Sequence, residues 1–257
     1  MRDWKPNRYH NGLERLHESL RPTRRQFLAG AAWLPFRSRG EVAVGGSRFL
    51  IVRRGRSNRR YVHIHGDEPT AREVLQEYLK THDGTGFFIQ SDTRVIPLAN
   101  GEIDPNRMFS DVGAAANLKR LNHGWSDAQV ERALEVLRPA RKKLLKELLP
   151  PPGGLVFAIH NNAKGYSMLD EIEASDKVSR RRPDEPHEFF LCTRQASYDV
   201  LTQSPYNVVL QTAGTPDDGS LSRLCARRNT PYVNLECGVG KREIQREMFE
   251  WAASRLA

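Results

Sequence analysis

The chain has 257 residues, of which 39% are hydrophobic and 28% are charged, a composition typical of a soluble globular protein with a core of its own. Its net charge of +9 originates near the start of the chain, because residues 1–60 contain 15 of the 40 Lys/Arg and only 4 of the 31 Asp/Glu. The near-neutral remainder argues against a nucleic-acid-binding domain, and the lack of an apolar run of about 18 residues argues against stable membrane insertion.

The first 45 residues form a basic segment that we expect to be separate from the folded domain. Arg24 and Arg25 are followed by Gln-Phe-Leu and then by a short, weakly apolar stretch at residues 29–36. This pattern resembles a twin-arginine export signal. We therefore predict a signal over residues 1–45, recognised by the twin-arginine export machinery, and one folded domain over residues 46–257 in the periplasm. A basic arm on a cytoplasmic protein is the alternative.

The first half of the expected domain alternates short apolar strands with helices. Residues 70–81 repeat apolar positions at helical spacing. The longest predicted helix begins after Ser126, a suitable N-cap with Gln129 three residues later, and ends at the breaker Pro-Pro-Pro-Gly-Gly that follows Leu149. The elements predicted here are strands at 48–52, 61–64 and 86–90 and helices at 70–81 and 126–149.

The second half contains continuous apolar runs, which are typical of strands buried on both faces. Strands are predicted at 155–159, 189–192, 208–211 and 232–235, with helices at 221–228 and 241–256. This alternation predicts an α/β fold, with a mixed, mostly parallel sheet of about eight strands flanked by helices. In such sheets ligands bind beyond the carboxyl ends of the strands.

Three of the predicted strands are followed by polar residues that could bind a metal. His65 and Glu68 follow the strand at 61–64, His160 follows the strand at 155–159, and Glu236 follows the strand at 232–235. Two imidazoles and one carboxylate form the ligand set of a catalytic zinc site, and a further carboxylate can act as its general base. For His160 alone, a structural histidine at a strand end is the alternative.

These residues, together with Asp104-Pro105-Asn106-Arg107, resemble the zinc carboxypeptidases of the M14 type. They also resemble the amidohydrolase relatives of that family, the succinylglutamate desuccinylases and aspartoacylases. The shared pattern is an HGxE-like motif, a D-x-N-R motif, a histidine after a central strand and a glutamate after a late strand, and it spans residues 48–257. The short spacing between Glu68 and His160 resembles the desuccinylase branch.

The resemblance implies zinc held by His65, Glu68 and His160, with Glu236 as the catalytic base. It also implies that Asn106 and Arg107 bind the terminal carboxylate of a substrate, a task that suits the planar guanidinium group. A surface arginine that follows Pro105 is the alternative for Arg107. The family also uses an arginine to stabilise the oxyanion, for which Arg94 is the nearest candidate, and a tyrosine that residues 212–220 lack.

The implied activity is zinc-dependent hydrolysis of an amide or peptide bond near a free carboxylate. An exported protein would then act on cell-wall peptides. Two alternatives remain open from the sequence. One is a deacylase of small N-acyl amino acids, and the other is a family member that binds peptide or metal without turnover. The expected partner in each enzymatic case is a peptide or N-acyl amino acid, and nucleic acid is not expected.

Overall fold

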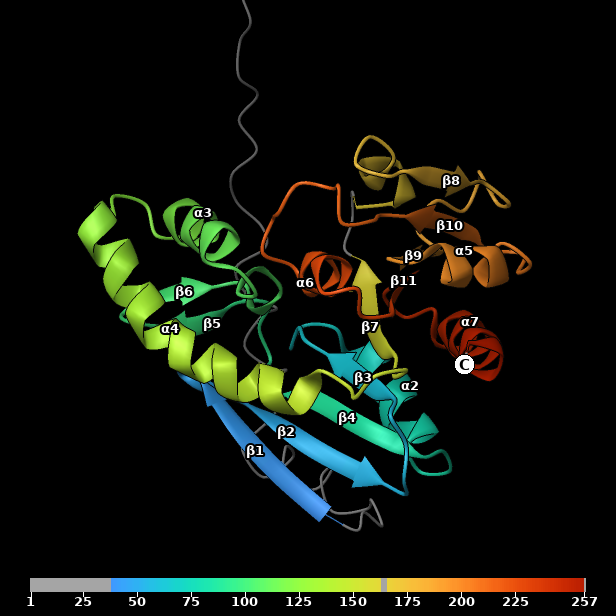
Figure 1. Cartoon of the computed structure of the whole chain (residues 1–257), viewed down its shortest axis with the longest axis horizontal. Helices are drawn as coiled ribbons and strands as arrows, with labels where there is room; N and C mark the ends of the chain where they lie inside the picture. Colours follow the sequence, from blue (N-terminus) through green and yellow to red (C-terminus); the bar gives the residue numbers. More distant parts are fainter. Residues whose placement is uncertain (1–37, 163–165, 257) are drawn as a thin grey trace, which may run out of the picture. The chain divides into compact units, whose positions relative to one another are not determined.

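The computed structural model describes residues 38–162 and 166–256, and one large sheet organises this part of the chain (Figure 1). The sheet has nine strands in the order β1-β2-β4-β3-β7-β11-β9-β10-β8. Its strands are β1 (Ser38–Val44), β2 (Ser47–Arg54), β3 (Arg60–His63), β4 (Gly84–Ile89), β7 (Val156–Asn162), β8 (Lys177–Ser179), β9 (Phe189–Cys192), β10 (Asn207–Leu210) and β11 (Tyr232–Gly238). Two short strands, β5 (Ile96–Leu98) and β6 (Gly101–Ile103), pair separately.

The centre of the large sheet is parallel. The strands β4, β3, β7 and β11 are neighbours and run in the same direction. Antiparallel pairings join β2 to β4 and β9 to β11, so the outer parts of the sheet are mixed. Following the pairings outward from β7, six of the nine strands point the same way. The predicted α/β fold with a mixed, mostly parallel sheet is confirmed.

Helices cover both faces of the sheet and give it two cores. Buried side chains of α3, α4 and α6 pack on one face, and those of α2, α5 and α7 pack on the other (Figure 1). The helices are α2 (Pro69–Tyr78), α3 (Asp111–Leu121), α4 (Asp127–Leu148), α5 (Gln195–Leu201), α6 (Leu221–Arg227) and α7 (Arg242–Arg255), with 3-10 turns η1 (Pro105–Arg107) and η2 (Met168–Glu171). The central strands are therefore buried on both sides, as their continuous apolar sequences predicted.

The start of α4 has the cap that its sequence predicted. The Ser126 side chain accepts a hydrogen bond from the backbone of Gln129, whose own side chain accepts one from the backbone N–H of Ser126. Pro139 lies inside this helix on its exposed side, yet the helix continues to Leu148. The apolar face on either side of Pro139 holds the helix against the sheet, and Leu137 and Leu144 are fully buried there.

The predicted domain boundary at residue 45 needs correction, because β1 lies before it. Residues 38–44 pair with β2 along their whole length, and the connecting turn is Gly45-Gly46, with Gly45 at a φ of +57°. The folded unit therefore begins no later than Ser38. The twin-arginine motif at Arg24 and Arg25 lies outside the described residues. Among the helices of the described part, none is long and apolar enough to cross a membrane.

Candidate metal centre and substrate cavity

The polar residues predicted as ligands lie together at the carboxyl edge of the parallel strands. His65 follows β3 by two residues, and Glu68 is the residue from which α2 begins. His160 and Glu236 lie within β7 and β11, which continue beyond the ends predicted for them, and the two residues are paired in the register of these strands. Because paired residues of adjacent strands point to the same face, this register brings the second predicted carboxylate beside the histidine.

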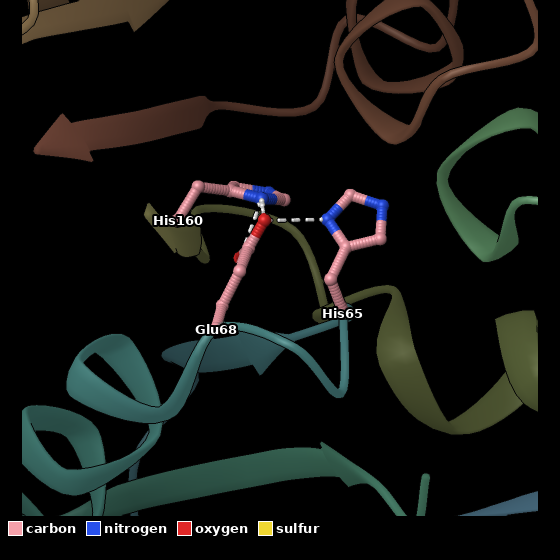
Figure 2. Close-up of side chains that lie close together, drawn as sticks. All are labelled: His65, Glu68 and His160. Atoms are coloured by element: carbon pink, nitrogen blue, oxygen red, sulfur yellow. Dashed lines mark hydrogen bonds and ion pairs between the residues drawn. The ribbon is translucent and has the colours of Figure 1, made fainter. Parts of the chain in front are cut away.

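His65, Glu68 and His160 form a buried cluster in which the carboxylate faces both imidazoles (Figure 2). The Nδ1 of His65 is 2.8 Å from Oε1 of Glu68, and the Nδ1 of His160 is 3.1 Å from Oε2. The three residues are only 1–3% exposed, and one ligand atom from each lies within 4.8 Å of the others. The structure thus brings these three predicted residues together, and their binding of a metal remains a proposal.

The donor set and its electrostatics fit a divalent cation. Burial acts to raise the pKa of Glu68, but the imidazoles of His160 and His65 hold it well below its usual value, so the carboxylate is ionised at neutral pH. Its Oε2 is buried, and apart from the approach of His160 Nδ1 at 3.1 Å it has no polar partner among the described residues. Two imidazole nitrogens and an ionised carboxylate are the ligands that zinc takes in catalytic sites.

Asp104 supports this cluster, a role that we did not predict from the sequence. Its Oδ1 accepts a hydrogen bond from Nε2 of His65 at 2.9 Å and one from the backbone N–H of Asn106 at 2.7 Å. Burial acts to raise the pKa of Asp104, but the bond from His65 and the charge of Arg107 lower it to about 2. An ionised partner on one ring nitrogen fixes the imidazole so that its other nitrogen faces Glu68. The D-x-N-R motif already contained this aspartate.

Arg94 lies at the edge of the cluster. Its Nη1 donates a hydrogen bond to Oε1 of Glu68 at 3.2 Å, and its side chain is 48% exposed. A guanidinium group in this position is available to a group that enters from solvent. The structure therefore places Arg94 beside a predicted metal ligand, and its role in stabilising an oxyanion stays a prediction.

Asn106 and Arg107 occupy the turn η1 on the other side of His65. The Oδ1 of Asn106 accepts a hydrogen bond from the backbone N–H of Leu221 at 3.1 Å, so this amide also anchors the start of α6. The Nη1 of Arg107 donates to the carbonyl of Asn106 at 2.9 Å and lies 3.6 Å from a carboxylate oxygen of Asp218. Among the described residues both of these contacts involve Nη1 of Arg107, which leaves its other nitrogens available to bind a carboxylate.

Glu236 is the second carboxylate of the site and is 5% exposed. Burial raises its pKa to about 7, against the opposing effect of His160. Among the described residues its side chain accepts one hydrogen bond, from Nδ2 of Asn234 at 2.9 Å. Glu236 is therefore a buried carboxyl group that can gain or lose a proton near neutral pH, unlike Glu68.

One cavity of about 310 Å³ joins these groups. All seven residues predicted from the sequence line it: His65, Glu68, Arg94, Asn106, Arg107, His160 and Glu236. Tyr166, Glu171, Gln211 and Arg223 also line it, and the sequence pattern did not indicate any of these four. Their signal is weak because they come from three separate segments, around η2, after β10 and in α6, and none stands in a motif.

Comparisons with known proteins find solved structures that are similar to this chain at low sequence identity. No protein-family model matches the chain, and no curated protein matches it. Solved structures that match include a succinylglutamate desuccinylase/aspartoacylase from Rhodobacter sphaeroides, at a TM-score of 0.44 and 14% identity over 81% of this chain. The murein-tripeptide amidase MpaA from Escherichia coli O157 matches at 0.48 and 18%, over 92% of this chain and 97% of its own.

The ectoine utilization protein EutE (DoeB) from Ruegeria pomeroyi matches at a TM-score of 0.45 and 12% identity over 81% of this chain. This chain spans 58% of the length of the Rhodobacter protein and 60% of the length of the Ruegeria protein.

Proposed function

We propose that this protein is a zinc-dependent hydrolase that cleaves an amide or peptide bond next to a free carboxylate. The observation that supports the proposal most directly is the buried cluster of His65, Glu68 and His160, with Glu236 paired in register beside it. This arrangement combines two imidazoles and a carboxylate, the ligand set of a catalytic zinc site, with a separate buried carboxylate that could act as a base.

Each group of the cavity has a distinct task in the proposed reaction. A zinc ion held by His65, Glu68 and His160 would acidify water and polarise the scissile carbonyl. Glu236 takes a proton from the attacking water and delivers it to the leaving amine. Asp104 holds His65 in one orientation through the bond to its Nε2.

Two arginines have separate tasks in the proposed reaction, and Arg107 is the one that would bind the free carboxylate of the substrate. Arg107 offers the planar donor pair that binds carboxylates, and Asn106 lies next to it on the same turn. Arg94, which contacts Glu68 and is half exposed, would stabilise negative charge on the carbonyl oxygen during the reaction. Substrate would thus be fixed at its carboxylate and activated at its carbonyl.

The cavity volume of about 310 Å³ suits a single amino acid with its acyl group, or the end of a peptide. A deacylase of small N-acyl amino acids is therefore the second candidate function. The two are distinguished by kcat/KM on N-acetyl amino acids against dipeptides and tripeptides with the same C-terminal residue. If the twin arginines at Arg24 and Arg25 direct export, the site of action is the periplasm and cell-wall peptides are the natural substrates.

Metal content of the full-length protein tests the proposal first. We expect about one zinc per chain by mass spectrometry, most of which is lost in His160→Ala. His123→Ala is the matched control, because His123 is exposed and does not line the cavity. Equal zinc in wild type and His160→Ala, or none after reconstitution, would contradict the metal site.

Turnover tests the base. Glu236→Gln should keep its zinc and lose activity by about 10²- to 10⁴-fold, the usual contribution of a positioned general base. Full activity in this variant would refute the role of Glu236. No hydrolysis by the zinc-loaded wild type across the peptide and N-acyl panel would favour a protein that binds without turnover.

A further inference from the structure

The helix α2 begins without a side-chain cap of its own. Glu68 occupies its N-cap position, where a side chain commonly accepts a hydrogen bond from a backbone N–H of the first turn. The carboxylate of Glu68 makes no such bond, because it faces the imidazoles of His65 and His160. The N–H groups at the start of α2 therefore need an acceptor from another part of the chain.

Asn161 supplies this acceptor from the strand β7. Its Oδ1 accepts a hydrogen bond at 2.9 Å from the backbone N–H of Ala71, the third residue of α2. Asn161 is buried and follows His160 directly, so the two side chains point to opposite faces of the sheet. The helix that begins at one predicted ligand, Glu68, is thus capped by the residue next to another.

Gln245 of α7 connects Asn161 to the backbone of His160. Its Oε1 accepts a hydrogen bond from Nδ2 of Asn161 at 3.0 Å, and its Nε2 donates to the carbonyl of His160 at 2.8 Å. The pairing of β3 with β7 extends only to Ala158, and the amide of Gln245 holds β7 beyond that point. Gln245 is fully buried and does not line the cavity, so it can act on the site only through these neighbours.

The outer partners of the two amides determine their orientations. A backbone N–H must meet the oxygen of Asn161, and a backbone carbonyl must meet the nitrogen of Gln245. The bond between the side chains then has to run from Nδ2 of Asn161 to Oε1 of Gln245, as it does. Each polar atom of the two side chains has a partner in the described part of the chain. A buried network that is fully satisfied in one arrangement is rigid.

We propose that Asn161 and Gln245 are positioning residues, which hold Glu68 and His160 in place before a metal binds. The inference rests on the proposed function for the identity of the metal, whereas the hydrogen bonds that carry it need no ligand. A site whose ligands are already ordered loses less conformational entropy on binding, so the network should raise the affinity for zinc. Its loss should weaken zinc binding by about 10- to 100-fold, as is usual when the support of a ligand is disturbed.

Chelator competition with the full-length protein measures this affinity. Asn161→Ala and Gln245→Met should each weaken zinc binding, and the double variant should lose little more than the weaker-binding single variant, because both belong to one network. Methionine has nearly the volume of glutamine, so Gln245→Met keeps the packing of α7. Cobalt(II) in place of zinc should show an altered visible absorption in both single variants, since this absorption depends on ligand geometry.

Asn207→Ala is the matched control for loss of a buried amide. Asn207 is fully buried, and its side chain bonds the backbone of Arg182 and Glu185, away from the cavity lining. This variant should lose stability in urea unfolding but keep the zinc affinity and the cobalt spectrum of the wild type. The comparison separates a general loss of stability from an effect on the ligands.

Amide exchange in the metal-free protein gives a readout that needs no zinc. The N–H of Ala71 should exchange about 10-fold faster in Gln245→Met, although the hydrogen bonds of Gln245 go to β7 and not to α2. A wild type that binds no zinc would refute the proposed function, and exchange at Ala71 would still decide the role of the network.

Three results would each overturn the inference. The first is a zinc affinity or an exchange rate at Ala71 that stays unchanged in Gln245→Met. The second is a double variant whose loss of affinity equals the full product of the two single losses. The third is a loss of zinc affinity in Asn207→Ala as large as that in Asn161→Ala.

Discussion

Substitution of Glu236 by glutamine should change how the stability of the metal-free protein depends on pH. In the folded chain, burial raises the pKa of Glu236 from 4.5 to about 7. In the unfolded chain the carboxyl group is exposed to water and titrates at its ordinary value. Glutamine has nearly the same shape, does not titrate and can still accept the hydrogen bond from Asn234. The comparison therefore isolates the proton on this residue.

The sign follows from the raised pKa. Below pH 4.5 Glu236 is protonated in both states and its titration has no effect on stability. As the pH rises from 4.5 to 7, the unfolded chain releases this proton while the folded chain keeps it, so unfolding becomes more favourable. At 1.36 kcal/mol for each pH unit, the wild type loses on the order of 3 kcal/mol over this interval, and Glu236→Gln does not.

Urea unfolding of both proteins between pH 4 and pH 8, after treatment with a chelator, measures the difference. Other titrating groups are common to the two proteins and largely cancel when their free energies of unfolding are subtracted. We expect the variant to gain about 3 kcal/mol on the wild type between the two ends of this range, with most of the change between pH 4.5 and pH 7. A difference that stays constant across the range would refute the inference that Glu236 is buried with a raised pKa.

Three further predictions concern the parts that position the site. Asp104→Asn should weaken zinc binding by about 10- to 100-fold in a chelator competition, whereas substitution of the exposed Asp92 by Asn should leave it unchanged. Equal zinc affinities of the wild type and Asp104→Asn would contradict the role of Asp104 in orienting His65. Removal of residues 38–45 should lower the free energy of unfolding by at least about 2 kcal/mol, because Val44 is fully buried. An unchanged midpoint of urea unfolding would contradict the pairing of β1 with β2 in the folded protein. Ser126→Ala should cost about 1 kcal/mol through loss of the α4 cap, against almost nothing for Ser254→Ala.

The sequence predicted those elements whose local pattern and tertiary environment agree. The strand β9 has the predicted limits, Phe189 to Cys192, because a continuous apolar run buried on both faces admits few alternatives. The site followed from the same elements, since parallel strands present their carboxyl ends at one edge of the sheet. The predictions for β7 and β11 ended too early, because a polar residue at a strand end marks the start of the site and not the end of the hydrogen-bonded ladder.

The elements that were missed lack a strong local signal. The edge strand β1 contains Arg39, Gly40 and Glu41, and only its pairing with β2 gives it strand structure. The helix α3 is built around Gly113 and three alanines, so its apolar period is weak, and Gly113 packs directly against the backbone of Gly219. Such elements depend on contacts with distant segments, which a single sequence does not display.

Two buried ionisable groups, Glu236 and Arg223, differ from Glu68 in how the fold balances their charge. The cluster around Glu68 is internally balanced, because two imidazoles and Arg94 surround one carboxylate. Glu236 has only a neutral amide as its hydrogen-bond donor, and Arg223 has an amide oxygen and a distant carboxylate. Within the described part of the chain neither group has a direct counter-charge, although both are buried. Both residues line the same cavity, so the two buried groups that lack a direct counter-charge lie at the proposed site.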